Sequence, residues 1–473
     1  MKQDLAQISL DRIDIDAEKV VRRLIRHGYE AYLVGGCVRD LLLRRIPKDF
    51  DVATSATPLE IKKVFRNCRI IGRRFRLAHI FFGSKIVETS TFRTNPNQGQ
   101  DEESDSEDLL IWRDNVFGTA KEDALRRDFT INGLFFDIQT QRVIDFVGGL
   151  EDLRVGTVRT IGDPDIRLQE DPIRILRAIK FATRLGLSVE SKTKRALVQH
   201  RGLIAKCSVS RVVEEIYKFL RSGHVADSFR MMHETGVLPV LFPELAYVLE
   251  PPDSPLAQEP VNAVGWIPRR KRVEAENEEE KSEDICVEAL RKNTAKLLED
   301  LDLVSKQART EASEQLWKNL RAMDGLVRAS EVPPEPPLLL GALLSCLVSE
   351  ACKEDRRFHQ TMEQLEKLVT SVCTRVRVSR RHRERLLQIL VAQRRFTSGR
   401  PKYSVISREY FPQAFQLFQL RHSATGNHEE AVVRWQEVVD KGYHKDRRRK
   451  RRPRRSHSPS RASHFSHPPK KGI

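Results

Sequence analysis

Hydrophobic residues in the first third of the chain follow two spacings in turn, which predict a mixture of helices and strands. Apolar positions recur at helical spacing over Asp14–His27. Tyr32–Val34 is a short apolar run that predicts a strand. Two further runs, Leu77–Phe82 and Lys85–Phe92, predict a hairpin around Gly83-Ser84. The first part of the chain therefore favours a sheet flanked by helices.

After about residue 156 the pattern becomes almost entirely helical. We expect an α+β protein, with an N-terminal head of mixed sheet and helices and then an all-helical neck, body and leg region. The expected boundaries are a head over 14–155, a neck over 156–249, a Pro- and charge-rich linker over 250–283, a body over 284–440 and a basic tail over 441–473.

Charge is distributed unevenly along the chain. The 473 residues carry a net charge of +17, and Lys441–Ile473 alone contains 13 Lys and Arg against one acid. A segment of this composition is expected to be disordered. It is typical of tails that bind polyanions such as RNA without sequence preference and in a salt-dependent way. A tail that serves only solubility is the alternative.

Cysteine usage and hydropathy indicate a cytoplasmic protein without membrane partners. The seven cysteines are scattered and form no C-x-x-C pair, which argues against a disulfide framework and a zinc site. The polar N-terminus does not resemble a signal peptide. The longest apolar run, Leu338–Val348, is too short to span a bilayer.

The predicted strand at Tyr32–Val34 ends at Gly35-Gly36, and a helix is expected to follow from Val38. Glycines let the backbone approach a bulky anion closely. The N–H groups at the start of the following helix would point at that anion. Arg39 adds a planar cation suited to phosphate. An ordinary tight turn is the alternative.

Asp49 and Asp51 form a D-x-D pair in a strand expected over Lys48–Val52, where alternate side chains share a face. Two carboxylates on one face repel each other unless a cation lies between them. Mg²⁺ takes oxygen ligands and is commonly shared with substrate phosphates. With the glycine turn, the pair predicts phosphoryl or nucleotidyl transfer, and an exposed strand edge is the alternative. Glu88, on the second hairpin strand, is a candidate third carboxylate.

A row of charges lies in Glu170–Phe181, a segment that its spacing predicts as one amphipathic helix. The charges recur every three residues and so share one side of that helix; they are Asp171, Arg174, Arg177 and Lys180. Spacing alone favours a solvated, charge-paired stripe.

Six ordered motifs resemble those of the class II nucleotidyltransferases, the family of bacterial poly(A) polymerases and CCA-adding tRNA nucleotidyltransferases. They lie within about Tyr29–Leu220 and read LVGGCVRDLLL, KDFDVATSATP, IVETSTFR, EDALRRDFTINGLFFD, IDFVGGLEDLRVGTVRTIGDP and EDPIRILRAIKFA. Within the family, Ile70–His79, DNVFGTAKEDALRRDFT and the Arg-rich tail are similar to the poly(A) polymerase branch. Lys180 departs from the arginine usual there.

The resemblance implies that the head is a nucleotidyltransferase domain and that AMP passes from ATP to an RNA 3′ end. It assigns Asp49 and Asp51 as catalytic Mg²⁺ ligands and Asp128 as a third catalytic carboxylate. The nucleotide-binding residues that it implies are Gly35, Gly36, Arg39, Arg127, Asp171, Arg174 and Arg177. Asp171 and Arg174 would read the base edge, because Asp171 accepts and Arg174 donates. The helical half and the tail would hold RNA phosphates.

Two alternatives stay open at this point. A CCA-adding enzyme shares every catalytic motif and differs in its use of CTP and in where it stops. An inactive RNA-binding protein on the same fold is the second alternative, and the intact Asp49–Asp51 pair speaks against it.

Overall fold

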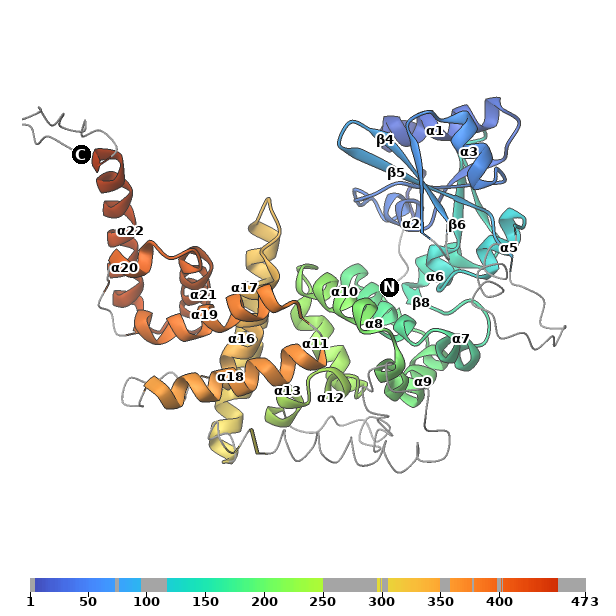
Figure 1. Ribbon diagram of the computed structural model, residues 1–473. Coiled ribbons are helices and arrows are strands. Elements are labelled where there is room, and N and C mark those ends of the chain that lie inside the picture. Colours follow the sequence, from blue (N-terminus) through green and yellow to red (C-terminus); the bar gives the residue numbers. More distant parts are fainter. Residues whose placement is uncertain are drawn as a thin grey trace, which may run out of the picture.

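In the computed structural model the described residues are 5–72, 76–94, 117–249, 296–297, 299, 305–348, 358–376, 378–397, 401 and 403–449. The predicted linker, the end of the basic tail and residues 73–75 of the Ile70–His79 segment lie outside them. Figure 1 shows the described chain as an elongated molecule, with the sheet at one end and the C-terminal helices at the other.

The head combines a mixed sheet with flanking helices, as the sequence predicts. Its strands are β1 (Ala31–Val34), β2 (Asp51–Thr54), β3 (Cys68–Ile71), β4 (Leu77–Phe82), β5 (Lys85–Thr91), β6 (Leu134–Asp137) and β7 (Arg142–Asp145). Its helices are α1 (Ile15–Arg26), α2 (Gly36–Leu42), α3 (Pro58–Val64), α5 (Ala120–Leu125) and α6 (Gly149–Val155).

The strands lie in the order β3-β4-β5-β2-β1-β6-β7, which places β2 at the centre. It is antiparallel to β1 and parallel to β5. The predicted hairpin is confirmed as β4–β5. The strand expected over Lys48–Val52 is wrong at its start, because β2 begins only at Asp51. Asp51 pairs with Val34, the last residue of β1 before the chain turns into α2, so Asp49 has no strand partner there.

The two faces of the sheet have separate cores. Leu33 and Val52 belong to the main core, on the face that α1 covers. Their neighbours Val34 and Ala53 belong to a smaller core with Ala124 of α5. Because strand side chains alternate between faces, Asp51 lies on the α5 face with Ala53.

The neck follows the head without a break, and the expectation that it is all-helical is wrong in one place, because Thr157–Val158 and Ser188–Val189 pair as a short parallel sheet. Its elements are β8 (Thr157–Val158), α7 (Pro164–Glu170), α8 (Ile173–Leu185), β9 (Ser188–Val189), α9 (Ser191–His200), α10 (Val209–Leu220), α11 (Val225–Glu234), α12 (Leu238–Leu241) and α13 (Pro243–Val248). Helix α8 packs against α10 and α11. Polar contacts join it to the head, since Arg184 pairs with Asp40 of α2 over 3.2 Å.

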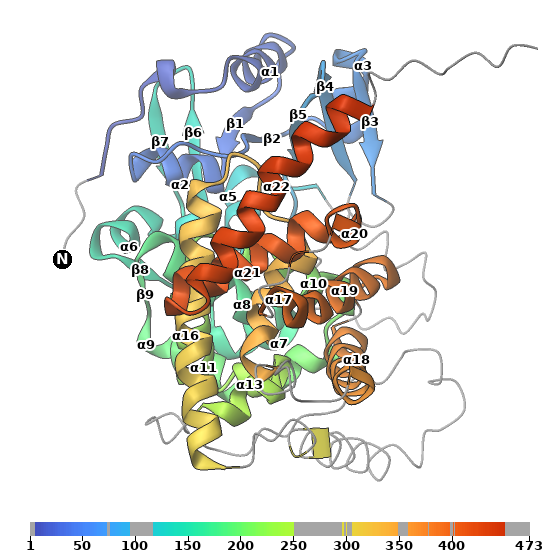
Figure 2. The ribbon, with the colours of Figure 1, turned by 90° about the vertical axis from the view of Figure 1, so that its left-hand side faces the viewer.

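The body is helical, as predicted. Its helices are α16 (Lys306–Ala329), α17 (Pro336–Leu344), α18 (Phe358–Arg375), α19 (Arg380–Thr397), α20 (Tyr403–Ile406), α21 (Phe411–Thr425) and α22 (Glu429–Arg449). Figure 2 shows α16 as a long helix running through it. A buried pair joins the body to the neck, with Arg375 of α18 donating two bonds of 2.7 Å to Glu244 of α13. Helix α22 continues past Asp440 into the segment predicted as tail.

The hydropathy of the described helices indicates no membrane-spanning segment. None of them is both long and apolar enough to cross a bilayer.

Candidate active site

The glycine turn lies between β1 and α2, and it begins the helix earlier than the sequence predicts. Helix α2 starts at Gly36, and Gly35 precedes it with φ 72° and ψ −125°, a conformation open to glycine alone among ordinary residues. A Cβ atom at Gly35 would lie 3.0 Å from Nη1 of Arg127. The turn therefore brings its backbone against an arginine that lies 92 positions later in the chain.

Asp51 and Glu88 lie on adjacent strands and on the same face of the sheet. The parallel register places Val52 beside Thr89, so the preceding residues of each strand, Asp51 and Glu88, are also neighbours. Asp51 is exposed at the end of β2, but the protein around its carboxylate excludes enough water to raise its pKa to about 6; the charges of Glu88 and Asp49 add to this rise while Arg127 opposes it. The structure thus brings both predicted aspartates and Glu88 into one region of negative charge.

This region suits a divalent cation in its chemistry. A cation between Asp49 and Asp51 would offset the charges of Glu88 and Asp49, which add to the effect of burial on the pKa of Asp51. Within the described part of the chain, no group of three or more His, Cys, Asp or Glu is arranged to hold a metal ion. Two carboxylates with further oxygen ligands from phosphate and water are what Mg²⁺ commonly takes. The residues present therefore fit Mg²⁺ shared with a substrate.

Arg127 lies beside the glycine turn and close enough to Asp51 to act on its pKa. Its guanidinium donates to Oδ2 of Asp123 over 2.9 Å and to the carbonyl of Asn132 over 3.4 Å. It also lies 5.2 Å from the ring centre of Phe135. These contacts fix a cation beside Gly35 and within electrostatic reach of Asp51.

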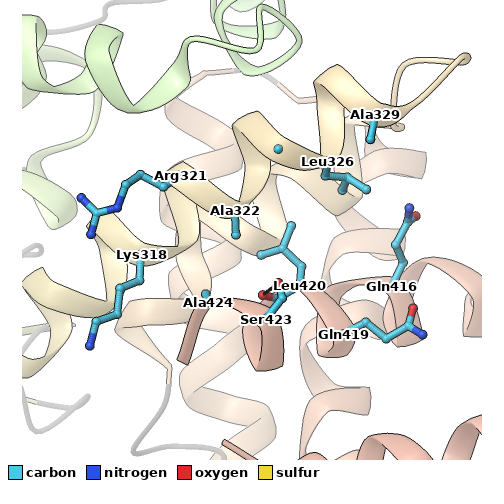
Figure 3. Close-up of a pocket in the computed structure, with 11 residues that line it drawn as sticks. Lys318, Arg321, Ala322, Leu326, Ala329, Gln416, Gln419, Leu420, Ser423 and Ala424 are labelled. Carbon is cyan, nitrogen blue, oxygen red and sulfur yellow. Dashed lines mark hydrogen bonds between the residues drawn. The ribbon is translucent and has the colours of Figure 1, made fainter. Parts of the chain in front are cut away.

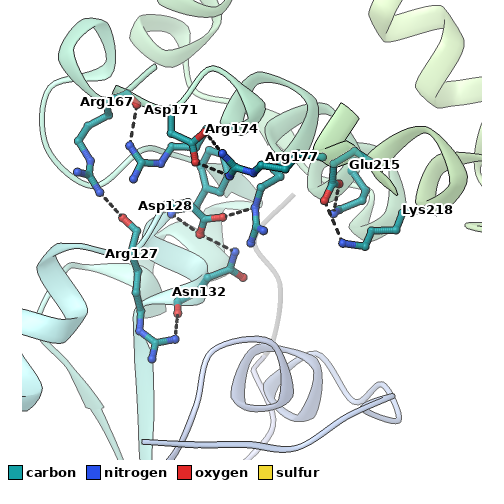
Figure 4. A network of polar contacts seen from close by, with 12 residues as sticks. Arg127, Asp128, Asn132, Arg167, Asp171, Arg174, Arg177, Glu215 and Lys218 are labelled. Atoms are coloured by element: carbon teal, nitrogen blue, oxygen red, sulfur yellow. Dashed lines mark hydrogen bonds and ion pairs between the residues drawn. The ribbon is translucent and has the colours of Figure 1, made fainter. Parts of the chain in front are cut away.

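Asp128 is held in a separate set of contacts. Its carboxylate accepts from Nε of Arg177 over 2.7 Å, from Nδ2 of Asn132 over 3.1 Å and from the N–H of Phe129 over 2.8 Å. Burial acts to raise the pKa of Asp128, but Arg177 and these hydrogen bonds outweigh it and hold the pKa below its usual value. Figure 4 shows this carboxylate facing Arg177 of the neck.

Arg39 is buried at the junction of head and neck. Its guanidinium donates to Oδ1 of Asp40 over 2.8 and 2.7 Å and to Oδ1 of Asn132. It also lies 5.1 Å from the ring centre of Phe181 on α8. The side chain expected to hold the triphosphate is thus engaged with protein groups, and it ties α2 to the neck.

The prediction that Glu170–Phe181 is one helix is wrong. Helix α7 ends at Glu170 and α8 begins at Ile173, with Asp171 between them at φ −146° and ψ 88°. Pro172 explains the break, because a proline disfavours helical geometry in the residue before it. Asp171 therefore does not share a helical row with Arg174.

Asp171 and Arg174 nevertheless lie close together, each held by a different helix. Nη1 and Nη2 of Arg211 on α10 donate to the two carboxylate oxygens of Asp171 over 2.9 and 2.8 Å. Arg174 donates to the carbonyl of Arg167 over 2.7 Å and to Glu170 over 3.2 Å. Figure 4 shows the two side chains next to each other above Asp128.

Lys180 lies deeper along α8. Its Nζ is 2.5 Å from Oε2 of Glu215, and Lys218 contacts the other oxygen of that carboxylate, Oε1, over 3.1 Å. Burial lowers the pKa of Lys180 to about 8 although Glu215 opposes that effect. Lys180 therefore pairs with Glu215 of α10, and it lies about one turn after Arg177 on α8.

Sequence reasoning missed three residues that organise this site: Asn132, Arg167 and Arg211. Asn132 lies inside one of the motifs that carry the resemblance, EDALRRDFTINGLFFD, so that motif could have pointed to it, but its contacts with Arg39 and Asp128 could not be predicted. Arg167 donates to the carbonyls of Arg126 and Arg127 over 2.8 Å each. Nothing in the sequence around Arg211 pointed to Asp171, since the two are 40 positions apart.

A hollow in the body lies away from these residues. This hollow of about 770 Å³ lies where α16 and α21 pack together, lined by Lys318 and Arg321 at one end and by Gln416 and Gln419 at the other (Figure 3). No acid lines it, so it offers no metal ligand and belongs to the body.

Three family models match successive parts of the chain. The Poly A polymerase head domain matches residues 31–159, the probable RNA- and SrmB-binding site of polymerase A matches 186–249, and the polymerase A arginine-rich C-terminus matches 354–467. The head model covers the glycine turn and the carboxylates, whereas Asp171, Arg174 and Arg177 fall between the first two models.

Curated relatives and a solved structure agree with these matches. Poly(A) polymerase I of Escherichia coli O6:H1 is 44% identical over 53% of this chain and 55% of its own length. A CCA-adding enzyme of Geobacillus thermodenitrificans is 36% identical over 46% of this chain and 52% of its own length. The chain thus spans about half the length of the curated relatives it matches. A solved CCA-adding enzyme in its apo form has the same fold, with a TM-score of 0.52, 19% identity and coverage of 94% of this chain and 86% of its own.

Proposed function

We propose that the chain, whose three model matches are all to poly(A) polymerases, belongs to the family of poly(A) polymerases and CCA-adding enzymes and is a template-independent poly(A) polymerase. It would transfer AMP from ATP to RNA 3′ ends and release pyrophosphate. The observation that carries the choice within the family is identity, which is 44% to a poly(A) polymerase and 36% to a CCA-adding enzyme. The arginine-rich C-terminal match supports the same choice.

The chemical step is substitution at the α-phosphate. The 3′-hydroxyl of RNA loses its proton to water as its oxygen forms a bond to that phosphorus, the bond to the bridging oxygen of the β-phosphate breaks, and pyrophosphate leaves. Asp49 and Asp51 would hold Mg²⁺, which neutralises the charge that develops on the reacting oxygens. Arg127 and the N–H groups beside Gly35 and Gly36 would hold the phosphates.

The neck would bind the base and the helical half the RNA. Asp171 would accept from the exocyclic amino group of adenine and Arg174 would donate to a ring nitrogen. The contacts of Asp128 support a role in holding Arg177 toward the nucleotide. The basic tail would increase capture of RNA phosphates, and its removal should then weaken the salt dependence of RNA binding. A cytoplasmic location belongs to the same proposal.

The test is nucleotide addition to a defined RNA. Purified protein is mixed with Mg²⁺ and a labelled RNA that lacks a terminal CCA, and each nucleotide is added alone, followed by ATP with CTP. A long ladder with ATP alone is the expected result. Addition that requires CTP and stops after three nucleotides would establish the CCA-adding alternative. If no nucleotide were added, the alternative of an inactive RNA-binding protein would remain.

A further inference from the structure

We infer that one face of strands β3, β4 and β5 binds the 3′ end of the RNA and directs it to the carboxylate of Asp51. The inference rests on the proposed function and deepens it, because it names where the RNA lies when AMP is added. It starts from side chains that cross the sheet at right angles to the strands, one from each of four neighbouring strands. This cross-strand row consists of Arg69, His79, Glu88 and Asp51.

The register of the strands places the members of the cross-strand row side by side. Arg69 of β3 pairs with His79 of β4, and His79 pairs with Glu88 of β5. Glu88 is the neighbour of Asp51 in the parallel register of β5 and β2. Because paired residues of neighbouring strands project to the same face, all four side chains lie on the face that carries Asp51. At the centre of the row, Nε2 of His79 lies 3.7 Å from Oε1 of Glu88.

This part of the face is open among the described residues, and Figure 2 shows β3, β4 and β5 together at one side of the head. Helices α1 and α3 pack against the opposite face. Helix α5 covers the neighbouring part, where the smaller core includes residues of β1, β2 and β6 but none of β3 or β4. Apolar side chains therefore stay exposed beside the row, 45% for Ile71 and 43% for Ile86. Phe81, on the strand between them, is only partly buried. Exposed apolar groups bordered by charged side chains are typical of a binding surface.

The order of charge along the cross-strand row matches that of an RNA 3′ end. The carboxylates of Asp51 and Glu88 lie at one end of the row and the guanidinium of Arg69 at the other. An RNA chain ends in a neutral 3′-hydroxyl, and negative phosphates precede it. Adjacent strands lie about 4.8 Å apart, so Arg69 is about 14 Å from Asp51 across the sheet. With the hydroxyl at the carboxylates and their Mg²⁺, an upstream phosphate would lie over Arg69, whereas the reverse direction would place phosphates on the acids.

Arg69 and Phe81 supply the two kinds of contact that single-stranded RNA uses. Cζ of Arg69 lies 5.7 Å from the ring centre of Phe81. Among the described residues no carboxylate pairs with Arg69, so its charge is free to meet a phosphate. Bases stack on an aromatic ring or a guanidinium plane whatever their identity. Contacts of this kind suit an enzyme that extends RNA ends of unrelated sequence.

Protection of a sheet edge is the other role open to Arg69. Strand β3 lies at one edge of the sheet, and a charge there hinders pairing with a second sheet. That role does not involve Phe81 and predicts no effect on RNA. Arg142 separates the two roles, because it lies on β7, the opposite edge strand, and on the same face.

The first test locates the RNA directly. Full-length protein is mixed with a short oligoadenylate that carries 5-iodouridine as its second or third base from the 3′ end, without any nucleoside triphosphate, and is irradiated. Cross-links to peptides that contain His79 or Phe81, identified by mass spectrometry, are expected. Cross-links found only outside β3, β4 and β5 would overturn the inference.

The second test measures addition of AMP to the same oligoadenylate without iodouridine. Arg69→Ala and Phe81→Leu should each raise KM for this RNA by about tenfold, the effect of one phosphate contact or one base stack, and leave KM for ATP unchanged. Phe81→Tyr should restore KM because it keeps the ring, and Arg69→Lys should restore it in part.

Arg142→Ala is the matched control and should retain the KM of the unaltered protein. Thermal unfolding without RNA checks that every variant is folded. An unchanged KM for RNA in both Arg69→Ala and Phe81→Leu would overturn the inference, and an equal rise in Arg142→Ala would do the same.

The proposed function can fail separately. If the unaltered protein adds CCA, or adds no nucleotide at all, that proposal fails. The cross-linked peptides still decide whether the RNA 3′ end lies on this face.

Discussion

Asp128 and Arg177 lie 49 positions apart in the chain, and Nε of Arg177 donates to Oδ2 of Asp128 over 2.7 Å. This contact joins the head to the neck helix α8 at the point where the candidate nucleotide site lies. Asn132 completes it, since its side chain donates to Asp128 and accepts from Arg39. Head and neck are thus coupled through the same groups that surround the candidate site.

Asp128→Asn should lower the free energy of unfolding by about 2 kcal/mol at pH 7, because a charged hydrogen bond to Arg177 is lost. The pKa of Asp128 lies below its usual value in the folded protein, so its contribution is present above about pH 4 and is lost as the pH falls further. Urea unfolding at pH 7 and in acid measures both effects. Arg177→Met, alone and combined with Asp128→Asn, gives the coupling energy, and a coupling near zero would contradict the contact.

Asp51→Asn should reduce AMP addition by about 10²-fold or more, because it removes a proposed metal ligand. It should also stabilise the metal-free protein by about 1 kcal/mol, a figure reduced for solvent screening. The pKa of about 6 means that the folded carboxylate keeps a proton which the unfolded chain releases. Stability therefore falls as the pH rises from about 4 to 6, and the gain in Asp51→Asn should appear above that range.

Thermal unfolding in EDTA at pH 4 and pH 8 tests this reasoning. Added Mg²⁺ should raise the Tm of the unaltered protein and leave that of Asp51→Asn nearly unchanged. Glu151→Gln, which removes an exposed acid of α6, is the control. If Mg²⁺ raised the Tm of all three proteins equally, Asp51 would not be a ligand of the ion.

Gly35→Ala and Gly83→Ala separate backbone strain from crowding at the site. Both glycines have positive φ, 72° and 61°, so both substitutions should destabilise the head, by about 1–3 kcal/mol. Only at Gly35 does the new Cβ meet another group, Nη1 of Arg127, whereas nothing lies within 4 Å at Gly83. Gly35→Ala should therefore also raise KM for ATP. If both variants had a similar KM for ATP, Gly35 and Arg127 would not form part of the phosphate-binding site.

Lys180→Arg should change the alkaline limb of the pH profile. Burial lowers the pKa of Lys180 to about 8, so its charge is lost well below the usual range for lysine. If that charge assists nucleotide binding, kcat/KM for ATP falls by about tenfold per pH unit above pH 8, and arginine abolishes the fall. Between about pH 8 and 10.5 the unfolded chain holds more protons at this site, so stability should rise with pH there. If the kcat/KM profiles of the unaltered protein and Lys180→Arg superimposed from pH 7 to 10, the charge of Lys180 would have no part in nucleotide binding.

Much of the fold was available from local pattern. The helix at Asp14–His27, the hairpin around Gly83-Ser84 and the helical second half follow from spacing and turn residues, which act over a few positions. The break at Pro172 was also available, because the restriction on the residue before a proline is local. The periodic charges on either side of it obscured that signal.

Contacts between distant segments were decided by tertiary structure alone. The sequence identified Asp51, Asp128 and Asp171 as acids, but each acquires a different partner. Strand register places Glu88 beside Asp51, α8 supplies Arg177 to Asp128, and α10 supplies Arg211 to Asp171. The sequence around a carboxylate does not indicate which charged group will lie beside it, because that pairing depends on how elements 35 to 50 positions apart pack. Motif and spacing determined which side chains are chemically able to act, and packing determined which of them repel, which are neutralised and which are held toward a base.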